Sequence, residues 1–126
     1  MLMTVVSNSV MAEWVMVGGS DDGMLAYADS ATIHKIGNNV KVWVIYDYKT
    51  SQADPFGGSK PYRSTKIQHE YDCKGEQIRV LAASLHTGNM GKGDMIYSEV
   101  NPSSPWQPII LGSMSEARWT LACGKK

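Results

Sequence analysis

The sequence predicts an α+β fold, a single antiparallel sheet of about six strands with one C-terminal α-helix packed on one face and tied to it by a disulfide. Three observations predict it. β-Branched, aromatic and apolar residues alternate with polar ones in short segments, and Gly, Asn, Asp and Pro clusters separate these segments. A capping-box pattern stands near the C-terminus at Ser113–Glu116. The chain also has two widely spaced cysteines.

The longest strand signal lies at residues 39–49, which contain no Gly or Pro. Because side chains of a strand alternate between its faces, one face is wholly apolar or aromatic and the other is mixed. We therefore expect this strand in the middle of the sheet. The apolar face consists of Val40, Val42, Val44, Tyr46 and Tyr48, and the mixed face of Lys41, Trp43, Ile45, Asp47 and Lys49.

Further strands are expected on both sides of this central one, with a tight hairpin at residues 37–39. The segment at 77–87 would also tolerate a helix. Residues 50–61 are polar and hold two Pro and two Gly, so they are expected to form an irregular loop, of the length that often carries function. The expected strands are 13–17, 24–28, 32–36, 62–72, 77–87 and 94–100.

The predicted helix runs from Met114 to Ala122 and ends at Gly124, with Met114, Ala117 and Leu121 sharing one face. A helix this short is marginal alone and must dock on the sheet. The apolar face of the central strand is the surface that it should cover.

Cys73 and Cys123 favour a structural disulfide in an exported protein, with two free buried thiols as the alternative. The bridge would close a loop of 50 residues (123 minus 73). The chain-entropy model gives such a bridge roughly 4 kcal/mol of stability.

Residues 1–12 carry no charge and resemble the end of a secretory signal, with a disordered N-terminus or an edge strand from Thr4 to Val10 as alternatives. Residues 13–126 then form one domain. Positive and negative side chains number 12 each and are interspersed, which argues against a nucleic-acid partner. No apolar run is long enough for a transmembrane helix.

An ordered set of motifs resembles the surface-adhesin E family. The motifs are Trp14 with Val17-Gly18, Tyr27-Ala-Asp29, Gly37-Asn38, Val40-Lys41-Val42-Trp43, Tyr46-Asp-Tyr-Lys49, Gln68-His-Glu-Tyr-Asp-Cys73, Glu76-Gln77 with Arg79, Gly88 with Met90-Gly91, Trp106 with Pro108, and Glu116, Trp119 and Ala122-Cys-Gly124.

The resemblance covers nearly everything from Trp14 to Gly124. It implies an antiparallel sheet with a C-terminal helix fixed by the two cysteines, and a periplasmic, outer-membrane surface or secreted location. It also implies a homodimer that adheres to host matrix or plasma proteins. The chain departs from the family in having no lipid-acceptor cysteine near its start.

Catalysis, cofactors and metal binding have little support in the sequence. The three histidines, His34, His69 and His86, show no ligand spacing and are interpreted as ordinary sheet residues. No G-x-S-x-G elbow occurs. The Gly-rich stretch at 88–93 precedes a strand, whereas a phosphate cradle precedes a helix.

The function predicted is therefore that of an exported, adhesin-like module that binds host matrix or plasma proteins or another envelope protein. The alternative is a periplasmic domain that binds a small ligand or serves the envelope, with a pocket between helix and sheet on the Trp43 or Tyr46 face. The candidate ligand surface is the cationic and aromatic rim of the long loop, and Trp43 and Ile45 form a candidate interface. The rim consists of Lys49, Phe56, Lys60, Tyr62, Arg63 and Lys66.

Overall fold

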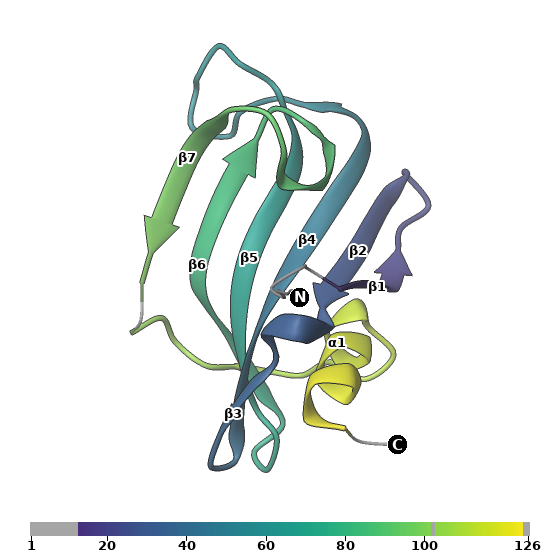
Figure 1. Cartoon of the computed structure of the whole chain (residues 1–126), viewed down its shortest axis with the longest axis vertical. Coiled ribbons are helices and arrows are strands. Elements are labelled where there is room, and N and C mark those ends of the chain that lie inside the picture. Colours follow the sequence, from purple (N-terminus) through teal and green to yellow (C-terminus); the bar gives the residue numbers. More distant parts are fainter. Residues whose placement is uncertain (1–12, 102, 125–126) are drawn as a thin grey trace, which may run out of the picture.

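The computed structural model describes residues 13–101 and 103–124 and has the predicted architecture (Figure 1). Six main strands form one antiparallel sheet in the order β1-β2-β4-β5-β6-β7. Two short strands extend it: β3 (His34–Ile36) pairs with β4, and β8 (Gln107–Pro108) pairs with β6. The main strands are β1 (Trp14–Gly19), β2 (Met24–Asp29), β4 (Asn39–Gln52), β5 (Tyr62–Asp72), β6 (Gln77–His86) and β7 (Met95–Val100).

The central strand is longer than predicted. β4 pairs with β2 on one side and β5 on the other, and after a register shift Gln52 pairs with Tyr62. Residues 50–52 therefore belong to the strand, and the irregular loop shrinks to residues 53–61. The polar composition of residues 50–52 hid this extension, because pairing with β5 satisfies the backbone there without an apolar face.

The predicted strand at 32–36 is also partly wrong. Ser30–Thr32 form a 3₁₀ turn, η1, whose start is capped by the Asp29 carboxylate accepting from the amide of Ala31. The Thr32 hydroxyl then accepts from the Trp43 amide, which fixes the turn to β4. Regular pairing starts at His34, and Gly37 (φ 61°) makes the predicted hairpin into β4.

The C-terminal helix α1 (Met114–Cys123) begins at the predicted residue and extends one residue beyond the predicted end at Ala122, up to the predicted cap at Gly124. Ser113 accepts from the amide of Glu116, and Gly124 closes the helix in the left-handed conformation. The Glu116 carboxylate accepts from the Gly112 amide, so it caps the loop just before the helix.

The buried side of α1 differs from the prediction. Ala117 is exposed, Leu121 is half-buried, and Arg118 and Ala122 are buried. These two residues are four apart and so lie on one face of the helix. A pattern based on apolar residues missed this face because its largest buried side chain is a charged arginine.

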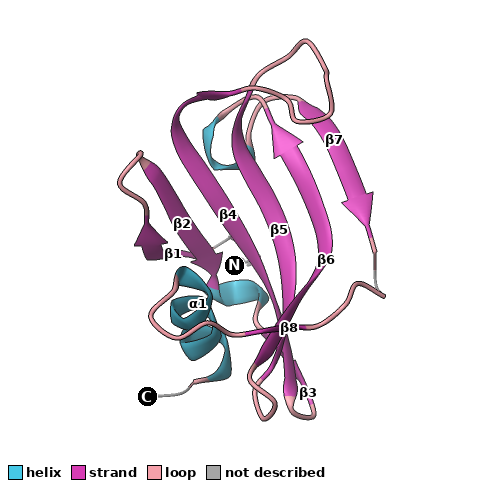
Figure 2. Cartoon of the chain, turned by 180° about the vertical axis from the view of Figure 1, so that it is seen from behind, coloured by secondary structure: helices cyan, strands magenta, loops and turns pink. Residues whose placement is uncertain are grey.

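The helix covers the apolar face of β4, as predicted (Figure 2). Val40, Val42 and Val44 are buried against Tyr71 and Ala122, while Tyr46 packs at the border of this core. Tyr48 lies farther along the strand and contacts Tyr62 edge to face, with 5.7 Å between ring centroids. The core therefore occupies one end of the β4 face.

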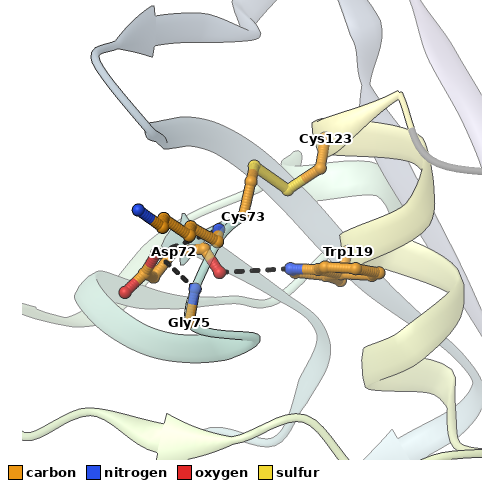
Figure 3. Close-up of a disulfide and its surroundings, with 6 residues drawn as sticks. Asp72, Cys73, Gly75, Trp119 and Cys123 are labelled. Carbon is orange, nitrogen blue, oxygen red and sulfur yellow. Dashed lines mark hydrogen bonds between the residues drawn. A yellow bond between two sulfur atoms is a disulfide. The ribbon is translucent and has the colours of Figure 1, made fainter.

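The Cys73–Cys123 disulfide is present and joins the β5–β6 turn to the last turn of α1 (Figure 3). The two Cα atoms are 5.6 Å apart, which suits an ordinary disulfide. Trp119 reinforces the connection, because its indole N–H donates to the Asp72 carbonyl over 3.3 Å. The Asp72 carboxylate accepts from the amides of Lys74 and Gly75, so the turn that holds Cys73 is itself fixed.

Candidate functional site

The six rim residues do not form one surface. Arg63 and Lys66 are three residues apart on β5, so their side chains leave opposite faces of the sheet. Lys66 lies over the Trp43 ring, with its Nζ 5.2 Å from the ring centroid. Arg63 donates to the Lys49 carbonyl and therefore stabilises the start of the loop. The period-two alternation along β5 already predicts that these two side chains lie on opposite faces of the sheet.

The other four rim residues lie at the end of the sheet opposite the disulfide, with the Lys49 side chain beside Gly23 of the β1–β2 turn and Tyr62 against Tyr48. Phe56 is 63% exposed and stacks on Tyr97 of β7, with 4.1 Å between ring centroids. Lys60 forms an exposed ion pair with Asp94 over 3.4 Å. We call this region, made of Lys49, Phe56, Lys60, Tyr62 and Tyr97, the loop-end surface.

Local hydrogen bonds hold loop 53–61 in place. The Asp54 carboxylate accepts from the Phe56 amide over 2.8 Å, and the Asp54 carbonyl accepts from the Gly57 amide. This turn presents the Phe56 ring to Tyr97. Sequence reasoning missed Tyr97. Tyr97 and Glu99 lie on one face of β7, and the Tyr97 hydroxyl donates to the Glu99 carboxylate, a hydrogen bond that raises the pKa of Tyr97.

The candidate interface at Trp43 and Ile45 needs a correction. Ile45 is only 1% exposed, so it offers no surface to a partner. The 3₁₀ segment η2 (Asn89–Gly91) folds over that face: the Asp47 carboxylate accepts from the Met90 amide, and Ser64 Oγ accepts from the Gly91 amide. The sequence indicated a turn at 88–93 but gave no sign that it would cover Ile45. Trp43 is half-buried and stays a candidate.

Sequence reasoning also missed a polar cluster beneath α1. The Arg118 guanidinium lies 5.2 Å from the Tyr46 ring centroid and acts electrostatically on Tyr46, His69 and Tyr71. Burial lowers the pKa of His69 to about 3, and the charge of Arg118 adds to this. Burial raises the pKa of Tyr71 despite the opposing effect of Arg118. At neutral pH the cluster thus holds a neutral imidazole beside a buried cation.

A cavity of about 490 Å³ opens beside this cluster, between α1, β6 and the connector that leads from β7 to the helix. Arg118 and His69 line its polar side. Ile78, Val80 and Ile110 line its apolar side. The small-ligand alternative placed a pocket between the helix and the Trp43 or Tyr46 face, whereas this cavity lies between the helix and β6.

A family model described as surface-adhesin protein E matches residues 14–124. The chain belongs to the surface-adhesin protein E family. A comparison with curated protein sequences gave no match.

Solved structures of Haemophilus influenzae protein E share the adhesin E fold of this domain. Its crystal form II superimposes with a TM-score of 0.68 at 9% identity, covering 94% of this chain and 96% of the other. Another structure of the protein gives 0.66 at 9% identity, covering 94% and 91%. Protein E from a non-typeable strain gives 0.65 at 10% identity, covering 94% and 80%. At such low identity these likenesses concern the fold alone.

The remaining polar groups of this adhesin E domain include one serine–histidine pair. Ser84 Oγ lies 2.7 Å from His86 Nε2, a distance that a serine nucleophile and its base would share. Both residues are buried within one strand, so a substrate cannot reach the hydroxyl. Within residues 13–101 and 103–124, no three His, Cys, Asp or Glu side chains converge as metal ligands. No helix of the described chain is long and apolar enough to cross a membrane.

Proposed function

We propose that this protein is an exported, non-enzymatic binding module that contacts a protein ligand through the loop-end surface. The observation that carries the proposal is the match to the surface-adhesin protein E family over residues 14–124. The family description supports a role in adhesion at the cell surface. A disulfide that joins two distant parts of the chain suits an oxidising, exported location.

The loop-end surface fits the chemistry of a protein contact. Phe56 supplies a large apolar ring that is exposed yet held by stacking on Tyr97, so little side-chain entropy is lost on binding. Lys49 and Lys60 supply charge for docking. Arg63 is excluded from direct contact because it donates to the Lys49 carbonyl and so stabilises the loop, and Lys66 is excluded because its ammonium lies over the Trp43 ring.

The ligand class follows from the family description and not from the geometry. Host matrix or plasma proteins are the first candidates, and another envelope protein is the second. Self-association into a homodimer would use the half-buried Trp43 together with the exposed side chains of Met16 and Leu25, which lie farther along the same face of the sheet, on β1 and β2.

Binding of the folded, oxidised domain to a panel of purified matrix and plasma proteins tests the proposal. The triple variant Lys49→Gln, Phe56→Ser and Lys60→Gln should weaken binding at least tenfold. A control variant removes the same charge elsewhere, at the exposed Lys35 and Lys74 near the disulfide, and should bind normally. Equal binding by the triple variant, or an equal loss in the control, would overturn the assignment of the surface.

A further inference from the structure

The cavity beside α1 lies in a part of the domain that the proposed protein contact does not use. It is lined by residues of β5, β6 and α1 and by residues of the connector. Figure 2 shows this connector crossing through β8 to the helix. A volume of about 490 Å³ falls within the roughly 300–1,000 Å³ that small-molecule sites occupy.

His69 gives the cavity an unsatisfied polar group. Its side chain is 4% exposed, and neither ring nitrogen makes a hydrogen bond among the described residues. Leaving a buried polar group without a partner destabilises the folded state. The imidazole is neutral at pH 7, so it offers one N–H donor and one acceptor nitrogen. A ligand with an oxygen atom would remove this cost.

Arg118 gives the cavity positive charge. It is 5% exposed, lines the cavity beside His69, and lowers the histidine pKa by its charge. Arg79 also lines the cavity, but the Glu70 carboxylate lies 2.7 Å from its guanidinium and neutralises it. The Trp106 ring further covers Arg79, with 4.4 Å between the guanidinium carbon and the ring centroid. Arg118 thus places a cationic side chain at the cavity next to His69.

The other walls exclude a strongly polar ligand. Ile78 and Val80 of β6 form one side, and Pro105, Pro108 and Ile110 of the connector form the other. An apolar body placed between them would remove side chains such as Val80 and Ile110, both exposed at present, from water.

We propose that this cavity binds a small monocarboxylate with an apolar body, its carboxylate beside Arg118 and His69 and its body between β6 and the connector. The carboxylate accepts from the guanidinium and from the imidazole N–H, which are charge-assisted and neutral hydrogen bonds respectively. The site lies on α1, β5 and β6, so this proposal can be tested independently of the loop-end surface.

Titration of the full, oxidised domain with octanoate tests the proposal. At pH 7, octanoate should shift the ¹⁵N resonances of the His69 ring saturably, with an affinity at least tenfold higher than that of 1-octanol or acetate. The alcohol has the same body without the charge, and acetate has the charge without the body. If octanoate binds no more tightly than 1-octanol, or shifts the spectrum without saturation, the proposal is wrong.

Two variants locate the site. Arg118→Gln should weaken octanoate binding at least tenfold while leaving 1-octanol unchanged. Val80→Trp, at a partly exposed position of the cavity wall, should block octanoate without altering any charge. If Arg118→Gln does not fold, the Val80→Trp variant and the comparison of octanoate, 1-octanol and acetate still test the proposal. Unchanged octanoate binding by Val80→Trp contradicts the site. Binding of a matrix protein by Val80→Trp should remain normal, which separates this proposal from that of the loop-end surface.

Discussion

The two ends of the β4 face are built in different ways. At one end, α1 packs on Val40, Val42 and Val44 and is held by the disulfide and by the Trp119 hydrogen bond. At the other end, loop 53–61 is held by short-range turns, an exposed ion pair and one ring stack. The first arrangement supplies stability, and the second keeps an aromatic ring and two lysines in water. With binding at the loop end as proposed, we expect that folding and binding can be altered separately.

The largest expected effect comes from removing the disulfide. The variant Cys73→Ser and Cys123→Ser should lose about 4 kcal/mol of unfolding free energy, because the unfolded chain regains the entropy of a 50-residue loop. Urea unfolding followed by tryptophan fluorescence measures this loss. A loss below about 1 kcal/mol would mean that the helix end does not depend on its bridge.

A matched pair of valines compares buried and exposed strand positions. Val42→Ala should cost about 2–3 kcal/mol, because Val42 is 1% exposed and the substitution leaves a cavity in the core. Val100→Ala, at a position that is 77% exposed on β7, should change stability by less than about 0.5 kcal/mol. Similar losses in the two variants, measured by urea unfolding, would contradict the contrast between the core and the outer strand.

The buried His69 should make stability depend on pH. In the folded domain its pKa is about 3, against an ordinary value of 6.5, so the unfolded chain binds more protons between these values. The free energy of unfolding must therefore fall as pH drops below about 6.5, and at pH 4.5 this histidine accounts for about 2–3 kcal/mol of the loss.

The variant His69→Gln isolates the histidine contribution from that of the carboxylates. Urea unfolding at pH 7 and pH 4.5, compared between the two proteins, should show a smaller pH-dependent loss in the variant. Parallel losses would mean that His69 can take up a proton without unfolding.

The smallest stability effect is expected at the loop end. Phe56→Ala should cost at most about 1 kcal/mol, because a stacked ring pair contributes roughly 0.5–1.5 kcal/mol and this one is largely exposed. Binding to a protein ligand should nevertheless weaken several-fold, as measured by surface plasmon resonance. A large loss of stability with unchanged affinity would reverse the roles assigned to the two ends.

The sequence predicted the parts of this fold that follow from short-range rules. Period-two alternation found the two faces of β4, and Ser113 and Gly124 marked the ends of the helix. Predictions weakened where long-range pairing decides: residues 50–52 join β4 only because β5 lies beside them, and Ile45 is buried only because η2 folds over it.

The residues of the two proposed sites were harder to predict than the fold. Arg118 is a charged residue in an apolar environment, so a search for apolar stripes passes over it. His69 has no partner at ligand spacing, so the sequence indicates only an ordinary sheet histidine. Tyr97 is far from Phe56 in sequence, and only the path of loop 53–61 brings the two rings together. Strand alternation alone places Arg63 and Lys66 on opposite faces of the sheet. It therefore predicts which residues share a surface better than closeness in the sequence does.

Hydrogen exchange of the oxidised domain, free and bound to whichever matrix or plasma protein it captures, tests the central claim most directly. The ligand should slow exchange of the backbone amides in loop 53–61 and at the start of β7, and leave α1 and the turn at Cys73 unchanged. Protection confined to α1 and that turn, with loop 53–61 exchanging as in the free domain, would contradict the assignment of binding to the loop end.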